Sequence, residues 1–171
     1  MTEKLRRVCK AYTVRNPEIG YCQGFNFMVG RFLKIMSEEE AFWMLTVLIE
    51  SFIPLDYYSK LIGAIVDKDV LSQLIRERMP DLWEHLDEQF YDPSNTSFQW
   101  MCCLFANNFS FLVIQRIWDL FFLKGSKILF RVSLAILHVI KPQLMKADSF
   151  ESIQKCFDGI QSLIQDARTV I

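Results

Sequence analysis

Glycine and proline are scarce in this chain, which holds 6 and 5 of them among 171 residues. Many short strands joined by tight turns would need more of both, so the scarcity argues against an all-β fold. An excess of charge is also missing, because 19 basic residues oppose 20 acidic ones. Global charge therefore gives no indication of a nucleic-acid partner or of binding to an anionic membrane, and we expect no nucleic-acid partner.

The cysteines lack the spacing of a metal site or of a redox pair. Their number is odd, and no C-x-x-C or Cys/His pattern joins Cys9, Cys22, Cys102, Cys103 and Cys156. The N-terminus is polar and charged, unlike a signal peptide. We therefore expect reduced, packed thiols, no metal and no cofactor, in a protein that is cytoplasmic or peripheral to endomembranes.

Charge is absent from Pro93 to Gln115, a stretch long enough to cross a bilayer. Several polar side chains interrupt it, and the composition predicts a break at Asn107-Asn108. Two buried helices explain the stretch better than one membrane span, so we expect no transmembrane segment.

Apolar residues make up 51% of the chain and aromatic residues 14%, which excludes disorder of the low-hydrophobicity kind. The length favours one domain with a sizeable core. Apolar residues recur with helical spacing from the first segment onward, where Leu5, Val8, Cys9 and Tyr12 form one stripe over residues 2–14. No alternating strand pattern and no internal repeat is present. We predict an all-α fold, a single-domain helical array of eight to ten helices.

Residues that can cap helices mark several of the boundaries. Ser37 with Glu40, and Thr96 with Gln99, have the spacing of a capping box. Further predicted boundaries are a helix cap at Asp67 or Asp69, a helix start at Pro80, a loop over 92–95, a cap at Ser110, and one last helix over 149–168 capped by Asp148 or Ser149.

One segment differs from the helices around it: Asn16-Pro17-Glu18-Ile19-Gly20-Tyr21-Cys22-Gln23-Gly24-Phe25-Asn26. Proline disfavours helix at the residue before it, and Gly20 and Gly24 permit backbone angles that other residues avoid. Gln23 is an uncharged amide that can orient a water molecule without taking its proton. On residue type alone, a hydrogen bond from Gln23 to the loop backbone is the simpler interpretation. A glycine-rich loop beside an apolar core nevertheless favours a partner surface over 15–26.

This segment carries a resemblance to a known family. Gly20-Tyr21-Cys22-Gln23-Gly24 with Asn26, preceded by Asn16-Pro17, resembles the YCQ motif of the TBC domain. Glu40-Ala41-Phe42-Trp43 is similar to the helix that follows this motif. The segment from Arg116 to Gly125 is similar to the family's R-x-W-D-x-x-x-x-x-G pattern, and the three landmarks stand in the family's order.

TBC proteins are GTPase-activating proteins for Rab-type small GTPases. The resemblance implies a regulator of membrane and vesicle traffic that acts in trans on a GTP-bound Rab protein and is not itself an enzyme. Gln23 would be the catalytic residue, because the family's glutamine replaces the water-positioning glutamine of the GTPase. Gly20, Tyr21, Cys22, Gly24 and Asn26 would contact the partner. No Walker-type loop is present, so we expect the chain not to bind nucleotide itself.

The chain departs from the family pattern in one important respect. The family supplies an arginine finger from an I-x-x-D-x-x-R segment upstream of the YCQ motif, and no match to it occurs here. An R-x-x-W signature is also missing, and only about 20 residues precede Gln23. We therefore expect residues 1–171 to be a partial TBC domain, its C-terminal two-thirds or more, with apolar surface exposed around Leu5 and Val8. The alternative function is an inactive TBC-like module that binds partners.

Overall fold

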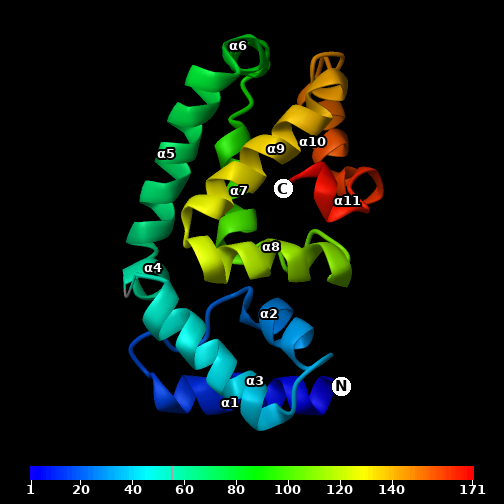
Figure 1. Ribbon diagram of the computed structural model, residues 1–171. Coiled ribbons are helices and arrows are strands. Elements are labelled where there is room, and N and C mark those ends of the chain that lie inside the picture. The colour runs from blue at the N-terminus through cyan, green and yellow to red at the C-terminus, as the bar shows by residue number, and fades with distance from the viewer. Residues whose placement is uncertain (55) are drawn as a thin grey trace.

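The computed structural model describes residues 1–54 and 56–171, and over these residues the fold is all-α with no strand (Figure 1). The predicted fold class is confirmed. Of the eleven α-helices in the described ranges, α4 and α11 are single turns of four residues, and they account for the excess over the predicted eight to ten. The helices are α1 (Thr2–Arg15), α2 (Phe25–Phe32), α3 (Glu38–Val47), α4 (Asp56–Ser59), α5 (Ile62–Arg78), α6 (Pro80–Glu88), α7 (Pro93–Cys102), α8 (Phe111–Lys124), α9 (Lys127–Leu144), α10 (Phe150–Asp158) and α11 (Ile160–Leu163), with a π-helical turn Leu48–Phe52 and a 3₁₀ turn Ala167–Thr169.

The first three helices form one end of the molecule, where α1 packs against both α2 and α3 (Figure 1). Helix α5 runs along one side from this end to α6, and its inner face packs against α7. Helices α8 and α9 pack together beside α7, and α10 packs against α9. The uncharged stretch thus becomes α7, a turn and the start of α8, as predicted. In the part of the chain that the structure describes, no helix is long and apolar enough to cross a membrane.

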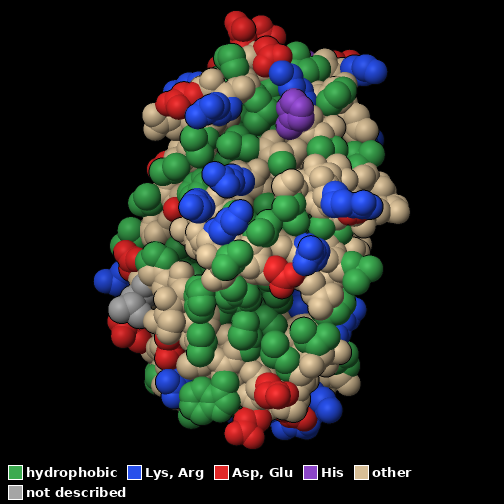
Figure 2. Space-filling model, in the orientation of Figure 1, with side chains coloured by type: hydrophobic (Ala, Val, Ile, Leu, Met, Phe, Trp, Pro, Cys, Tyr) green, Lys and Arg blue, Asp and Glu red, His purple; other side chains and the backbone are tan. Residues whose placement is uncertain are grey.

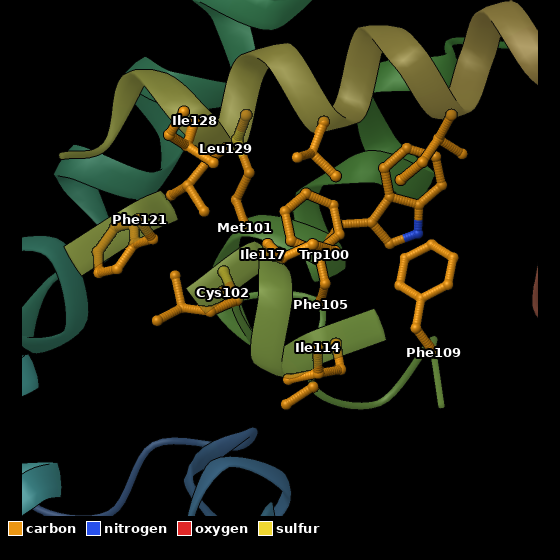
Figure 3. Close-up of a cluster of buried hydrophobic side chains, with 14 of the residues drawn as sticks. Trp100, Met101, Cys102, Phe105, Phe109, Ile114, Ile117, Phe121, Ile128 and Leu129 are labelled. Carbon is orange, nitrogen blue, oxygen red and sulfur yellow. The ribbon is translucent and has the colours of Figure 1, made fainter. Parts of the chain in front are cut away.

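The core is richest in aromatic side chains around α7. Trp100, Phe105 and Phe109 are at most 1% exposed, and Figure 3 shows them packed with Ile114 and Ile117 of α8 beneath α9. Burial of one such side chain contributes about 1.5–3 kcal/mol to folding. The end of α7 is therefore fixed within the buried core.

The backbone that leaves α7 is held by side chains from three other helices. The Tyr58 hydroxyl donates to the Cys102 carbonyl at 3.0 Å, and Trp118 Nε1 donates to the Leu104 carbonyl at 2.9 Å. The Arg31 guanidinium donates to the carbonyls of Ala106 and Phe109 at 2.8–3.0 Å. The bond to Cys102 satisfies one of the carbonyl groups that a helix end leaves without partners, and the other bonds hold the turn that follows. They also hold Leu104 and Phe105 at positive φ angles of 46° and 62°, a sparsely populated region for such residues.

Some predicted helix boundaries are confirmed. Ser37 and Glu40 form the expected capping box at the start of α3. Pro80 opens α6, and the Ser110 side chain caps α8.

Other predicted boundaries are wrong, each for a tertiary or local reason. Helix α5 runs through Asp67 and Asp69 without a break, because its buried residues Ala64, Leu71 and Ile75 continue along one face against α7. The last segment is not one helix, since α10 ends at Asp158 before a short α11.

The predicted loop over 92–95 and the capping box of Thr96 with Gln99 are wrong together. Asp92 caps α7 by accepting a hydrogen bond from the Ser94 amide at 2.8 Å, and Pro93 takes the first helical position. Thr96 therefore lies inside the helix, where its hydroxyl bonds the Tyr91 hydroxyl.

The exposed apolar surface also lies elsewhere than expected. Val8 is buried, and Leu5 packs against the core and approaches Gly30. Figure 2 shows apolar side chains gathered over the lower part of the molecule, near α2 and α3, where Trp43 and Val47 are 48% and 43% exposed.

Replacing Arg31 tests how much the structure depends on its contacts. Arg31→Met should lower the free energy of unfolding by about 2–3 kcal/mol, because two carbonyls lose a charged donor. Arg116→Met is the matched control: its exposed i,i+3 pair with Asp119 should contribute no more than about 0.5 kcal/mol. Urea denaturation measures both, and equal losses for the two variants would contradict the structural role of Arg31.

Candidate functional site

The loop between α1 and α2 is tied down at its start by Asn16. The Asn16 side chain donates to Glu50 Oε1 at 3.1 Å and accepts from the Ile19 amide at 3.3 Å. The Gly20 amide then donates to the Asn16 carbonyl at 2.9 Å, with Gly20 at a φ of +65°. The loop therefore leaves α1 in a defined turn that favours glycine at position 20.

At Gly24 the end of the loop packs closely against the end of α7. Its φ is +117°, and a Cβ atom here would lie 2.8 Å from Cys103 Sγ and 3.5 Å from the Cys102 carbonyl oxygen. The Gly24 carbonyl accepts from the amides of Phe27 and Met28 and so begins α2. Glycine is required here both for the backbone angle and for the close approach.

Aromatic rings support the loop from below. Phe25 is 1% exposed and makes edge-on contacts with Tyr12, Tyr21 and Tyr58, at centroid distances of 5.6, 6.2 and 5.1 Å. Tyr21 is itself 54% exposed, and its hydroxyl donates to Asn26 Oδ1 at 3.2 Å. The structure thus brings Tyr21 and Asn26, two of the predicted partner contacts, together at the surface.

Gln23 is exposed, and its side-chain amide bonds none of the residues that the structure describes. The simpler interpretation, in which the Gln23 side chain bonds the loop backbone, is therefore wrong for the described residues. The amide lines a cavity of about 340 Å³, whose walls are formed by Cys22, Gln23, Phe27, Leu61, Phe98, Gln99, Cys102 and Cys103. Of the predicted site residues, the cavity includes Cys22 and Gln23.

The rest of the cavity wall is not predicted by the sequence. Leu61 and Phe98 come from distant segments, and only packing places them here. Gln99 was assigned to a capping box, which the Asp92 cap displaces. Cys102 and Cys103 stand out in the sequence only as thiols without a partner motif.

The thiols of the cavity are protonated at neutral pH. Burial raises the pKa of Cys22, that of Cys102 to about 12 and that of Cys103 to about 11. The thiolate is the nucleophilic form of cysteine, so these groups are poor nucleophiles. The cavity therefore offers neutral hydrogen-bonding groups on an apolar wall, which can orient a polar molecule but cannot neutralise charge.

The two arginines nearest the loop in sequence, Arg15 and Arg31, are engaged elsewhere. Arg15 pairs with Glu50 at 3.2 Å and lies over the Trp43 ring, 5.3 Å from its centroid. Arg31 is bound to the backbone after α7, and burial lowers its pKa. Neither residue lines the cavity.

The Rab-GTPase-TBC domain model matches residues 1–145. The chain belongs to this family. It is 36% identical over 170 residues to the human TBC1 domain family member 2B and 40% identical over 171 residues to the bovine TBC1 domain family member 2A. Each match covers 99% of this chain and 18% of the relative, so the chain spans under a fifth of the length of these relatives.

Two solved structures have the same fold. The Chlamydomonas flagellar RabGAP TBC domain superposes with a TM-score of 0.86 at 31% identity, over 98% of this chain and 56% of that one. The Ypt/Rab-GAP domain of Gyp1p superposes with a TM-score of 0.79 at 25% identity, over 93% of this chain and 59% of that one. The helical arrangement of this TBC chain is therefore that of solved RabGAP domains, while the roles of Gln23 and its neighbours stay predictions.

Gly24→Ala tests the contact between the loop and α7. The variant should be less stable by about 1–3 kcal/mol, because its φ is strained and its Cβ meets Cys103 Sγ. In a Cys103→Ala background the cost should shrink, since the sulfur is gone and the backbone strain alone remains. Chemical denaturation measures both.

Gly30→Ala is the control, with ordinary space at Leu5 and a helical backbone, and should be neutral or more stable by about 0.5–1 kcal/mol. A Gly24→Ala variant as stable as this control would contradict the contact. Because the substitution disturbs packing, Gly24→Val would probe the fold of the loop and not partner contact alone.

Proposed function

We propose that this TBC chain acts on a GTP-bound Rab-type GTPase and contributes the water-orienting glutamine of a GTPase-activating site, Gln23. The observation that supports this most directly is the state of the Gln23 amide: it is exposed, has no partner among the described residues, and stands at a cavity in the family's YCQ loop. A glutamine held for structural reasons would use its amide within the fold.

GTP hydrolysis requires an in-line water and compensation of the charge that develops on the phosphates. Gln23 can supply the first requirement, because its carbonyl oxygen accepts from water and its amide nitrogen donates. It cannot supply the second, because it carries no charge. An arginine must therefore come from outside the cavity described here, and Arg15 and Arg31 are both held by other groups.

The surface around the loop supports the partner assignment. Gly20 and Gly24 shape the turn, the Cys22 side chain lines the cavity, and the exposed Tyr21 with its bonded Asn26 forms the adjoining rim. A GTPase seated over the loop would contact these residues together. Such a regulator would work in the cytoplasm or at the periphery of endomembranes, in vesicle traffic.

The second candidate is an interaction module without catalytic activity. The engagement of both Arg15 and Arg31 favours it, since charge compensation would then be missing. The two functions share the same partner surface and differ in whether hydrolysis accelerates.

Single-turnover hydrolysis with a panel of GTP-loaded Rab proteins separates the two. The 171-residue chain should accelerate hydrolysis weakly or not at all, because an arginine finger contributes about 10³–10⁵ in rate. A version extended at its N-terminus with the family's I-x-x-D-x-x-R segment should be active. In that version Gln23→Ala should lose about 10²-fold in rate, because the water is no longer placed.

Gln143→Ala, at an exposed position on α9, is the matched control and should keep full activity. Full activity of the 171-residue chain would show that one of its own arginines moves into the site. An extended form that is indifferent to Gln23→Ala would refute the role proposed for the glutamine, and an inactive extended form that still binds GTP-loaded Rab would favour the interaction module.

A further inference from the structure

The cavity beside Gln23 contains a second glutamine, Gln99, in the last turn of α7. Gln99 is exposed, although the next two residues, Trp100 and Met101, are 1% and 0% exposed. Those two side chains fix the rotation of α7 in the core, so Gln99 is held on the cavity side of the helix. Its side-chain amide, like that of Gln23, has no bonding partner within the described chain.

The contact between the loop and α7 places Gln23 and Gln99 near each other. A Cβ atom at Gly24 would lie 2.8 Å from Cys103 Sγ, and the Cys103 amide donates to the Gln99 carbonyl at 3.0 Å. Residues four apart on a helix are neighbours on its surface. Gln99 thus lies one helical turn from the residue that touches Gly24, and Gln23 directly precedes Gly24 in the loop.

The Gln23 side chain needs such a neighbour if it is to place a water molecule. Glutamine has three rotatable side-chain bonds, and a catalytic constellation must be held within about 0.5 Å of its productive geometry. The other cavity walls cannot hold an amide well, because Phe27, Leu61 and Phe98 are apolar and thiols bond weakly. Among the residues that line the cavity, Gln99 is the other one with a strong donor and a strong acceptor.

We propose that Gln99 is a positioning residue for Gln23, an inference that rests on the function proposed above. When a GTPase covers the cavity and water is expelled, Gln99 Oε1 accepts a hydrogen bond from Gln23 Nε2. The Gln23 Oε1 atom is then fixed in direction and free to accept a hydrogen bond from the attacking water. Gln99 acts through Gln23 and has no contact of its own with the nucleotide.

A double-mutant cycle in the N-terminally extended protein tests this coupling, with Gln23→Ala, Gln99→Met and the double variant compared by GTP hydrolysis. Methionine matches glutamine in length and helix propensity but cannot form the bond. Gln99→Met should lower kcat about tenfold or more while KM stays within about twofold, because a misplaced group costs rate and not affinity. In the Gln23→Ala background the same change should have no further effect, since residues that act as a unit are not additive.

Gln143→Met serves as the matched control and should leave kcat and KM unchanged. Equal losses from Gln99→Met in both backgrounds, or a higher KM with kcat unchanged, would overturn the proposal while leaving the role of Gln23 intact. A wild-type rate in the Gln23→Ala variant would instead reject the proposed function, and this inference with it. Thermal unfolding confirms that the variants fold, and Gln99→Ala replaces Gln99→Met if the methionine variant does not.

Discussion

The carbonyl groups at the end of α7 are the constraint on which the rest of the structure depends. Each of the last four finds a partner: three accept from backbone amides of residues 103–105, and the fourth, of Cys102, accepts from Tyr58. The turn that follows is held by Trp118 and Arg31. Because Tyr58, Trp118 and Arg31 come from α4, α8 and α2, this one helix end joins the N-terminal helices to the central core. The candidate site is built on the same turn, since Cys103 is the residue against which Gly24 rests.

The cavity beside Gln23 is lined by uncharged side chains, and this limits what the candidate site can do chemically. Amides and protonated thiols on an apolar wall can direct a molecule without exchanging a proton with it, and this suits a residue that orients water. In the function proposed above, the electrostatic part of phosphoryl transfer is delivered by another group. A division of labour between a neutral orienting residue and a separate cation is what the TBC family resemblance implies, and the geometry here is compatible with the neutral half.

The sequence allowed the fold class to be predicted because helical periodicity is a local property. A capping box could also be predicted where no second capping residue lies nearby, as at Ser37. Prediction failed where two local signals competed, as when Asp92 displaced Thr96 as the cap of α7, and where packing overrode a local signal, as in α5 at Asp67. The loop around Gln23 was identifiable from its glycines and its motif. The opposite wall of the cavity was not, since Leu61, Phe98 and Gln99 meet the loop only through tertiary packing.

The sharing of one helix end by the core and the cavity has a thermodynamic consequence. A molecule that bound this cavity in the folded chain, and not the unfolded chain, would stabilise the turn in which Leu104 and Phe105 have positive φ angles. The coupling is reciprocal. A substitution in the aromatic cluster around Trp100 that shifts this turn would, by the same linkage, change the affinity of the cavity for that molecule.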